Sequence, residues 1–323
     1  MKGRVISSTG NWYEVETSAS QSFACKVKGN FRLKGLKTTN PVAVGDWVEI
    51  EHDPRISSGS GMPGGWITSI DERRNCIIRK SVNLSKQTHV IAANIDMAFL
   101  VAGLTQPRTP QGFLDRFLVT AEAYHVPVCL IFNKSDLFDA DMQAEYLEYS
   151  RIYRDIGYRV LRTSTMDGDG IGELKETMDG KTCLFAGNSG VGKSALIHCL
   201  APQLNIRIGE ISQTHLKGKH TTTYAQMYKL WGSTAIIDTP GIKEFGMVQF
   251  TKDELALYFP EMKELLPHCR FSNCTHEHEP GCAVKAAVNE GRIAPIRYKS
   301  YLNILHGEEV PAPSLLDNRQ ERK

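Results

Sequence analysis

The stretch that decides the fold is Gly-Asn-Ser-Gly-Val-Gly-Lys-Ser at residues 187–194, which matches the pattern G-x-x-x-x-G-K-[ST]. It follows an apolar run at residues 182–186 and precedes a helix-prone segment at residues 195–200. In this setting the glycines let backbone N–H groups turn inward around a phosphate, which also faces the positive end of the helix. The pattern predicts a phosphate-binding loop, and the residues expected at the nucleotide are Gly187, Asn188, Ser189, Gly190, Val191, Gly192, Lys193, Ser194 and Ala195.

Two side chains of this loop carry the expected chemistry. Lys193 is predicted to reach the β- and γ-phosphate oxygens, which makes it a candidate catalytic residue. The Ser194 hydroxyl is predicted to be a ligand of Mg²⁺. The alternative interpretation is a glycine turn with a solvated lysine.

A second motif, Asn133-Lys134-Ser135-Asp136, follows the apolar run at residues 126–132. It should therefore lie at the carboxyl end of a buried strand, where open α/β sheets bind their ligands. The Asp136 carboxylate can accept hydrogen bonds from guanine N1–H and from the exocyclic amine, a pairing that adenine cannot make. Lys134 would lay its aliphatic chain on the ring, and Asn133 would hold the loop in place. Because of the Asp136 pairing, the motif beside a phosphate-binding loop favours GTP over ATP. A capped turn is the alternative.

The next predicted strand, residues 159–163, ends at Thr163 and Ser164. These two residues could add a backbone contact to the base, or they could simply cap a helix. The order of the motifs is unusual, because the guanine-reading tetrapeptide precedes the phosphate-binding loop. A permuted order keeps the site but moves the chain ends, so it decides which appended domain is linked to the nucleotide.

Asp238-Thr239-Pro240-Gly241 follows the apolar run at residues 234–237 and is predicted to sense the γ-phosphate. Asp238 would hold Mg²⁺ through water, and the Gly241 N–H would bind the γ-phosphate; a simple turn is the alternative. The second protein ligand of Mg²⁺ should be a threonine, and Thr222 is favoured, although the sequence does not separate it from Thr221 or Thr223.

Ile242 stands where many GTPases carry the glutamine that orients the attacking water. Either hydrolysis is intrinsically slow, or another group supplies the polar contact. His220, beside the expected magnesium threonine, is the candidate for that catalytic role, and a solvent-facing histidine is the alternative.

Three cysteines and one histidine form the pattern Cys-x4-Cys-x-His-x5-Cys near the C-terminal end. Such a ligand set predicts a closed, structural Zn²⁺ site at Cys269, Cys274, His276 and Cys282. His268 and His278 compete with His276 for the fourth position. Core cysteines are the alternative, but the polar neighbours of this segment argue against it. The other five cysteines, Cys25, Cys76, Cys129, Cys183 and Cys199, are expected to serve packing.

Hydrophobic patterning predicts three parts. Residues 1–80 contain five short β-prone runs between turns and should form an OB-type β-barrel. Residues 81–247 alternate apolar strands with helical segments, residues 112–124 and 140–156 among them, as in an α/β GTPase domain with a parallel sheet. Residues 248–323 are expected to form a helical zinc-binding module, with helices at residues 253–266 and, last, at residues 283–289.

Composition excludes several classes of protein. The chain has 323 residues and a formal net charge of +2, so nucleic-acid affinity must come from local patches. Eight cysteines in this length are not a disulfide framework, and the first residues are not followed by an apolar stretch of signal-peptide length. The longest apolar run, residues 126–132, is too short to span a membrane. We expect a cytosolic protein with reduced thiols and no membrane partner.

With these motifs in this order, the chain resembles the circularly permuted GTPases of the RsgA type, which act in maturation of the small ribosomal subunit. The resemblance covers nearly the whole length: the barrel, the guanine motif, the phosphate-binding loop, residues 218–223, residues 238–241 and the Cys/His cluster. It implies GTP hydrolysis stimulated by that subunit, binding to its rRNA, and zinc at the cluster. A monomer that cycles between GTP and GDP is expected. Gly190 stands where potassium-activated GTPases carry an asparagine, so potassium dependence is not predicted.

The chain order suggests a coupling route, because Gly241 is followed almost directly by the zinc module. We hypothesise that the barrel and the zinc module hold RNA and that GTP sets their relative orientation. Two other functions stay open at this point: a GTP-gated RNA-binding module, or an RNA-modification GTPase with little intrinsic turnover.

Overall fold

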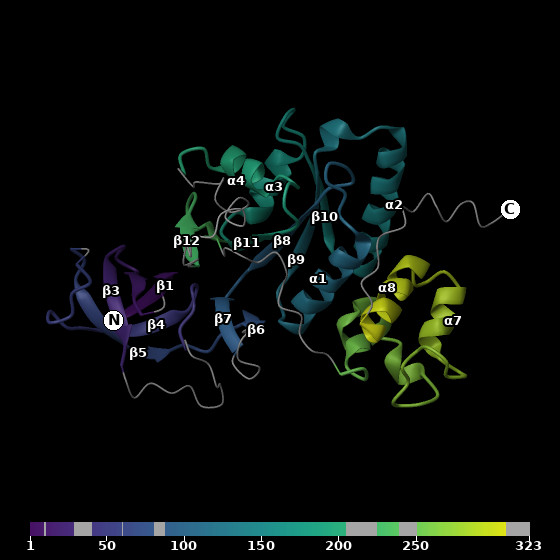
Figure 1. The fold of residues 1–323 in the computed structure, drawn as a ribbon, viewed down its shortest axis with the longest axis horizontal. Coiled ribbons are helices and arrows are strands. Elements are labelled where there is room, and N and C mark those ends of the chain that lie inside the picture. Colours follow the sequence, from purple (N-terminus) through teal and green to yellow (C-terminus); the bar gives the residue numbers. More distant parts are fainter. Residues whose placement is uncertain are drawn as a thin grey trace, which may run out of the picture.

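The structure, a computed structural model, describes residues 1–9, 11–28, 41–59, 61–80, 88–204, 225–238 and 251–307. A barrel and a helical module flank a central α/β domain, as Figure 1 shows. The expected division into three parts is therefore found. The expected boundaries at residues 80/81 and 247/248 lie at or within segments outside the described residues, so they stay predictions.

Five strands form the N-terminal barrel at the positions predicted from the short β-prone runs. They are β1 (Lys2–Ser8), β2 (Tyr13–Thr17), β3 (Ser22–Val27), β4 (Trp47–His52) and β5 (Gly64–Ile70). The pairing order β1-β2-β3-β5-β4 closes through a further β1–β4 pairing, and β3 runs parallel to β5. Alternate side chains point inward, and the barrel core includes Val5, Val15, Phe23, Val48 and Ile67.

The central sheet has the order β10-β9-β8-β11-β13-β12. Its parallel strands are β8 (Met97–Ala102), β9 (Val128–Asn133), β10 (Arg159–Thr163), β11 (Thr182–Ala186) and β13 (Ala235–Asp238). The antiparallel strand β12 (Gln226–Lys229), which the sequence analysis missed, pairs with β13. The chain steps outward from β8 to β10 and then returns to place β11 on the other side of β8. This reversal is the point at which open α/β sheets form their ligand crevice.

Helices cover both faces of this sheet. Helices α1 (Gln111–Ala123) and α2 (Ala140–Ile156) pack with Leu100 on one face, whereas α3 (Ile171–Met178) and α4 (Lys193–Leu200) pack with Phe99 on the other. Neighbouring residues of β8 thus belong to different cores, as the two-residue period of a strand requires. The predicted helices at residues 112–124 and 140–156 correspond to α1 and α2.

The barrel and the central sheet are continuous. Strand β1 pairs with β12 at Ser7 and Gln226, so that the barrel and the central sheet together form one eleven-stranded sheet. A two-stranded sheet of β6 (Cys76–Lys80) and β7 (Thr88–Ala93) lies between them in the sequence, and Val44 of the barrel bridges to Ala92. The sequence analysis did not predict this junction.

The C-terminal module differs from expectation at two points. The single helix expected at residues 253–266 is wrong: η2 (Leu255–Tyr258), α6 (Pro260–Lys263) and η3 (Leu266–His268) take its place. Pro260 restricts Phe259 to extended backbone, which separates η2 from α6. Helix α7 (Ala283–Asn289) is where it was expected, but α8 (Pro295–His306) follows it and was missed. Within the described residues, no helix is both long enough and apolar enough to cross a membrane.

Candidate functional site

The phosphate-binding loop occupies the turn between β11 and α4, at the crevice of the sheet. Gly187 has a φ of +136°, and a Cβ there would lie 2.1 Å from the Val101 carbonyl oxygen of β8. Gly192 has a φ of +98°, and its Cβ would lie 2.3 Å from Asn133 Nδ2. Both positions require glycine, because the backbone of the loop passes close to two neighbouring strands. Lys193, Ser194 and Ala195 form the first turn of α4.

The Lys193 ammonium lies across this loop. Its Nζ donates to the carbonyl oxygens of Gly187 and Asn188, both at 2.7 Å. The loop therefore curls around the amine, and the lysine occupies the concave side where an anion would be bound. Of the remaining loop residues, Val191 is buried, whereas Ser189 and Gly190 are exposed.

Asn133 joins the guanine motif to the phosphate-binding loop. Its Nδ2 donates to the Val191 carbonyl oxygen at 2.9 Å, and its Oδ1 accepts from Thr163 Oγ1 at 2.9 Å. Asn133 is 2% exposed, and both the nitrogen and the oxygen of its side-chain amide have hydrogen-bond partners inside the protein. One buried side chain thus holds together the ends of β9, β10 and β11.

Asp136 and Lys134 lie on the solvent side of this brace. Asp136 Oδ1 accepts from Ser164 Oγ at 2.7 Å, which fixes the carboxylate. Thr163 and Ser164 both hydrogen-bond to the guanine motif, and α3 begins only after Gly170, so neither caps that helix. Lys134 adopts the left-handed conformation (φ +66°), and its ammonium donates to the Gln106 carbonyl oxygen.

Sequence reasoning missed a third segment of the site, residues 103–110, which follows β8. A Cβ on Gly190 would lie 3.2 Å from Pro107 Cδ, so the proline ring contacts the phosphate-binding loop. The segment is closed at its base by Thr109, whose N donates to the Gly103 oxygen at 2.7 Å and whose Oγ1 accepts from Gly103 N at 3.0 Å. Its position at the end of a buried strand was the available signal.

Asp238 ends β13, the strand that pairs with β11 on the side away from β8. Burial raises the pKa of this carboxyl group. A divalent cation beside it would favour the charged form, as a magnesium role requires. The other residues expected around the γ-phosphate, His220, Thr221, Thr222, Thr223 and Gly241, lie outside the described residues.

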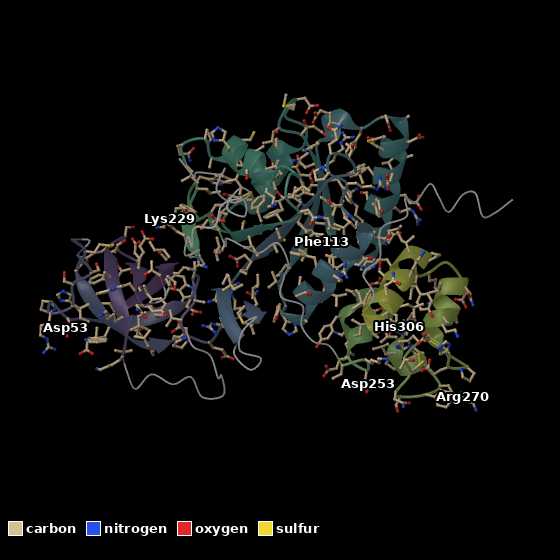
Figure 2. The ribbon with its side chains drawn as sticks, in the orientation of Figure 1. Asp53, Phe113, Lys229, Asp253, Arg270 and His306 are labelled. Atoms are coloured by element: carbon tan, nitrogen blue, oxygen red, sulfur yellow. The ribbon has the colours of Figure 1, made fainter. Side chains whose placement is uncertain are left out.

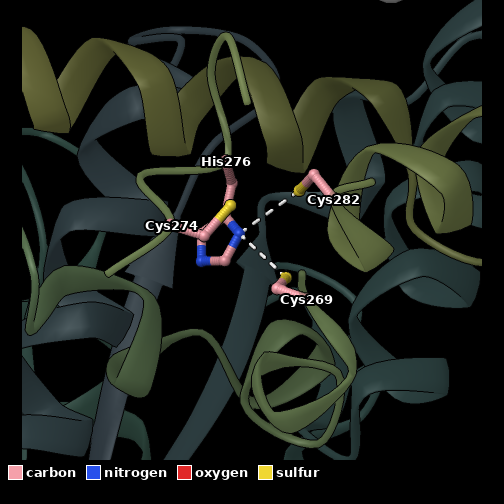
Figure 3. Close-up of side chains that lie close together, drawn as sticks. All are labelled: Cys269, Cys274, His276 and Cys282. Atoms are coloured by element: carbon pink, nitrogen blue, oxygen red, sulfur yellow. Dashed lines mark hydrogen bonds between the residues drawn. The ribbon is translucent and has the colours of Figure 1, made fainter. Parts of the chain in front are cut away.

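The Cys/His cluster is assembled as the spacing predicts. Figure 3 shows the side chains of Cys269, Cys274, His276 and Cys282 gathered in one place. Their ligand atoms all lie within 4.8 Å of one another. His276 Nδ1 is 3.6 Å from Cys269 Sγ and 3.4 Å from Cys282 Sγ. A tetrahedral zinc ion separates a nitrogen from a sulfur ligand by about 3.6 Å, so the donor set fits that metal. Burial also lowers the pKa of His276, which favours the neutral imidazole a metal needs.

The loop that carries His276 is held by helix α8. Tyr298 OH donates to the His276 carbonyl oxygen at 2.6 Å, and Tyr301 OH donates to that of Thr275 at 2.8 Å. Although desolvation opposes the shift, hydrogen bonds led by those from Thr275 lower the pKa of Glu279 to about 2.

His278 faces Glu277 at 3.2 Å and is not in the cluster. Cys199, expected to pack, is exposed instead.

Comparison with known proteins agrees with this arrangement. The RsgA N-terminal domain family matches residues 2–58. A relative named small ribosomal subunit biogenesis GTPase RsgA 2, from Bacteroides thetaiotaomicron, is 48% identical over 96% of this chain and 97% of its own length. The Flavobacterium johnsoniae relative of the same RsgA name is 48% identical over 96% of this chain and 94% of its own.

Two solved structures share the fold. YjeQ from Thermotoga maritima has a TM-score of 0.73 and 33% identity, covering 95% of this chain and 97% of its own. YloQ, described as a circularly permuted GTPase, has a TM-score of 0.71 and 27% identity, covering 95% of this chain and 94% of its own. The RsgA GTPase family matches residues 70–248, and with relatives this similar over this much of its length, the chain belongs to the RsgA GTPase family.

Proposed function

We propose that this GTPase acts in maturation of the small ribosomal subunit, with the subunit and its rRNA as partners, in the cytoplasm and as a monomer. The observation that carries the nucleotide part is the hydrogen bond from Asn133 Nδ2 to the Val191 oxygen at 2.9 Å. It joins one residue of each motif, and these two residues are 58 positions apart in the sequence. The names of the relatives support the ribosomal part.

In this proposal each residue of the nucleotide site has a defined task. Asp136 accepts from the guanine edge, Lys134 covers the base, and Lys193 leaves the loop carbonyls to bind phosphate oxygens. Ser194, Asp238 and one of the threonines at 221–223 would hold Mg²⁺, which neutralises charge on the phosphates when bound. His220 is the proposed substitute for the glutamine that Ile242 replaces.

The four cluster residues Cys269, Cys274, His276 and Cys282 are proposed to hold one structural Zn²⁺. All four positions of a tetrahedral ion are filled by protein atoms, so the ion would stabilise the module and would not bind substrate.

Multiple-turnover phosphate release tests the enzymatic part of the proposal. We expect slow turnover by the protein alone and a marked rise when purified small subunits are added. An unchanged slow rate, together with GTP-dependent cosedimentation, would indicate a GTP-gated binding module instead. No cosedimentation with small subunits would favour a GTPase that serves RNA modification.

A further inference from the structure

A polar cluster lies beside the guanine motif, on the side away from the phosphate-binding loop. It consists of Ser135, Arg162 and Asp169, from η1 (Ser135–Leu137), from β10 and from the loop before α3. Ser135 Oγ donates to Asp169 Oδ2 at 2.7 Å, and Arg162 Nε donates to the same oxygen at 2.7 Å. Neither Arg162 nor Asp169 was expected in the site from the sequence.

Asp169 also binds through its backbone. Its carbonyl oxygen accepts from Ser164 N at 2.9 Å, and Ser164 Oγ in turn donates to Asp136. The next residue, Gly170, has a φ of +67°, and a Cβ there would lie 1.8 Å from the Arg162 carbonyl oxygen. This close approach fixes where Asp169 can lie relative to β10.

Asp169 therefore contacts both segments that hold Asp136: the motif itself through Ser135, and the loop after β10 through Ser164. We propose that Asp169 is a positioning residue for guanine recognition, which sets the Asp136 carboxylate against the base edge without touching the nucleotide. The inference rests on the proposed function, because it assigns a specificity role within the same site.

The ion pair by itself would contribute little to stability. The Arg162 and Asp169 side chains are 37% and 33% exposed, and pairs with that exposure are strongly screened. Arg162 is held separately by Gln143 Oε1 at 3.2 Å and by the Tyr146 ring. The cluster is thus ordered from several sides, which suits a positioning role better than a stabilising one.

The test compares GDP with IDP, whose base lacks the exocyclic amine and so makes one hydrogen bond fewer to Asp136. Asp169→Ala should weaken GDP binding about tenfold and IDP binding less, so that the ratio Kd(IDP)/Kd(GDP) falls about threefold. Asp169→Asn keeps an acceptor for Ser135 and should restore most of that ratio. Ser135→Ala, which leaves the Arg162 pair intact, should lower the ratio in the same direction and serves if Asp169→Ala does not fold.

Glu173→Ala is the matched control, because it removes an exposed acid that pairs with Arg159 between α3 and β10. It should leave the Kd ratio unchanged. Equal weakening of GDP and IDP by Asp169→Ala and Ser135→Ala, or no weakening, would overturn the inference. Failure of the unaltered protein to bind GDP would instead remove the proposed function.

Discussion

The two ends of the molecule are attached to the GTPase domain in different ways. The zinc module shares a buried core and a buried ion network with helix α1. The barrel meets the central domain through strand pairing, through Val44, which belongs to the core of the central domain, and through an ion pair that is partly open to solvent. The difference indicates which end can respond to the nucleotide.

Arg297 of α8 is the centre of the first attachment. It is 0% exposed and donates to Asp115 of α1, also 0% exposed, and its Nε donates to Glu261 Oε1 at 2.7 Å. Tyr153 OH of α2 donates to the same Asp115 carboxylate at 2.8 Å. Val119 of α1 belongs to the core of the zinc module. We therefore expect the module to move with α1 as one body.

The barrel is attached at β12, the strand beside β13 of the nucleotide site. Ser8 N donates to the Ala225 oxygen at 3.4 Å, and Lys229 pairs with Glu16 at 2.6 Å. Figure 2 labels Lys229 on the side of the central domain that faces the barrel. Because β12 begins four positions after Thr222 in the sequence, we hypothesise that a change at that threonine is passed to the barrel. The route from Gly241 into the zinc module lies outside the described residues and stays a prediction.

Removing zinc should have the largest effect on stability and should unfold the zinc module alone. Structural zinc sites stabilise small domains by about 10–16 kcal/mol at neutral pH, so Cys282→Ser or chelation should unfold the module. Limited proteolysis should cut residues 251–307 while the barrel stays intact, and metal analysis should give one zinc per chain for the unaltered protein. Cys199→Ser, an exposed cysteine on α4, is the control. Full zinc retention by Cys282→Ser would contradict the assignment.

Arg297→Met should separate the zinc module from α1. The change leaves Asp115 buried without its cation, which costs about 3–5 kcal/mol, measured by chemical denaturation. Arg292→Ala breaks an exposed pair with Glu290 and should change stability by less than about 1 kcal/mol. If the two variants lose similar stability, the buried network does not fix the module.

Gly45→Ala should weaken the barrel junction. Gly45 has a φ of +94°, and a Cβ there would lie 2.1 Å from the Ala93 oxygen of β7, so about 2–3 kcal/mol of stability should be lost. Gly59→Ala is matched in φ, at +76°, but meets nothing within 4 Å, and should cost about 1 kcal/mol. Thermal unfolding measures both, and equal losses would mean that the close approach is unimportant.

Lys229→Ala should have the smallest effect. The pair with Glu16 joins side chains that are 59% and 18% exposed, so about 0.5 kcal/mol is expected, and less at high salt. Lys28→Ala removes a pair with Glu51 inside the barrel, at 59% and 64% exposure, and is the control. Denaturation at two salt concentrations checks the prediction. A loss of stability near that of Arg297→Met would contradict the proposed difference between the two attachments.

Local patterns in the sequence predicted most of the fold. Short β-prone runs between turn residues, such as those that contain Val5 and Val15, revealed the barrel strands. The cluster ligands were found because they lie within fourteen positions. Helix α8 was missed although Pro295 at its first turn and Gly307 after its end mark its limits. Strand β12 has four residues and little apolar character, so its pattern was too weak to recognise.

The missed parts of the site depend on contacts between distant residues. Asp169 meets Ser135 across 34 positions, and Gln106 meets Lys134 across 28. No sequence motif marks either residue, because Gln106 and Asp169 reach the site only through their positions after β8 and β10 in the folded sheet. Such residues emerge only once the strands are assembled.

Calorimetric titration with Mg²⁺ and either GDP or ADP tests the central claim that the permuted motifs form one guanine-nucleotide site. We predict saturable binding of one GDP per chain, no comparable binding of ADP, and a shift of Asp136→Asn toward xanthosine diphosphate. Equal affinity for ADP and GDP, or no uptake of GDP by the unaltered protein, would contradict the account.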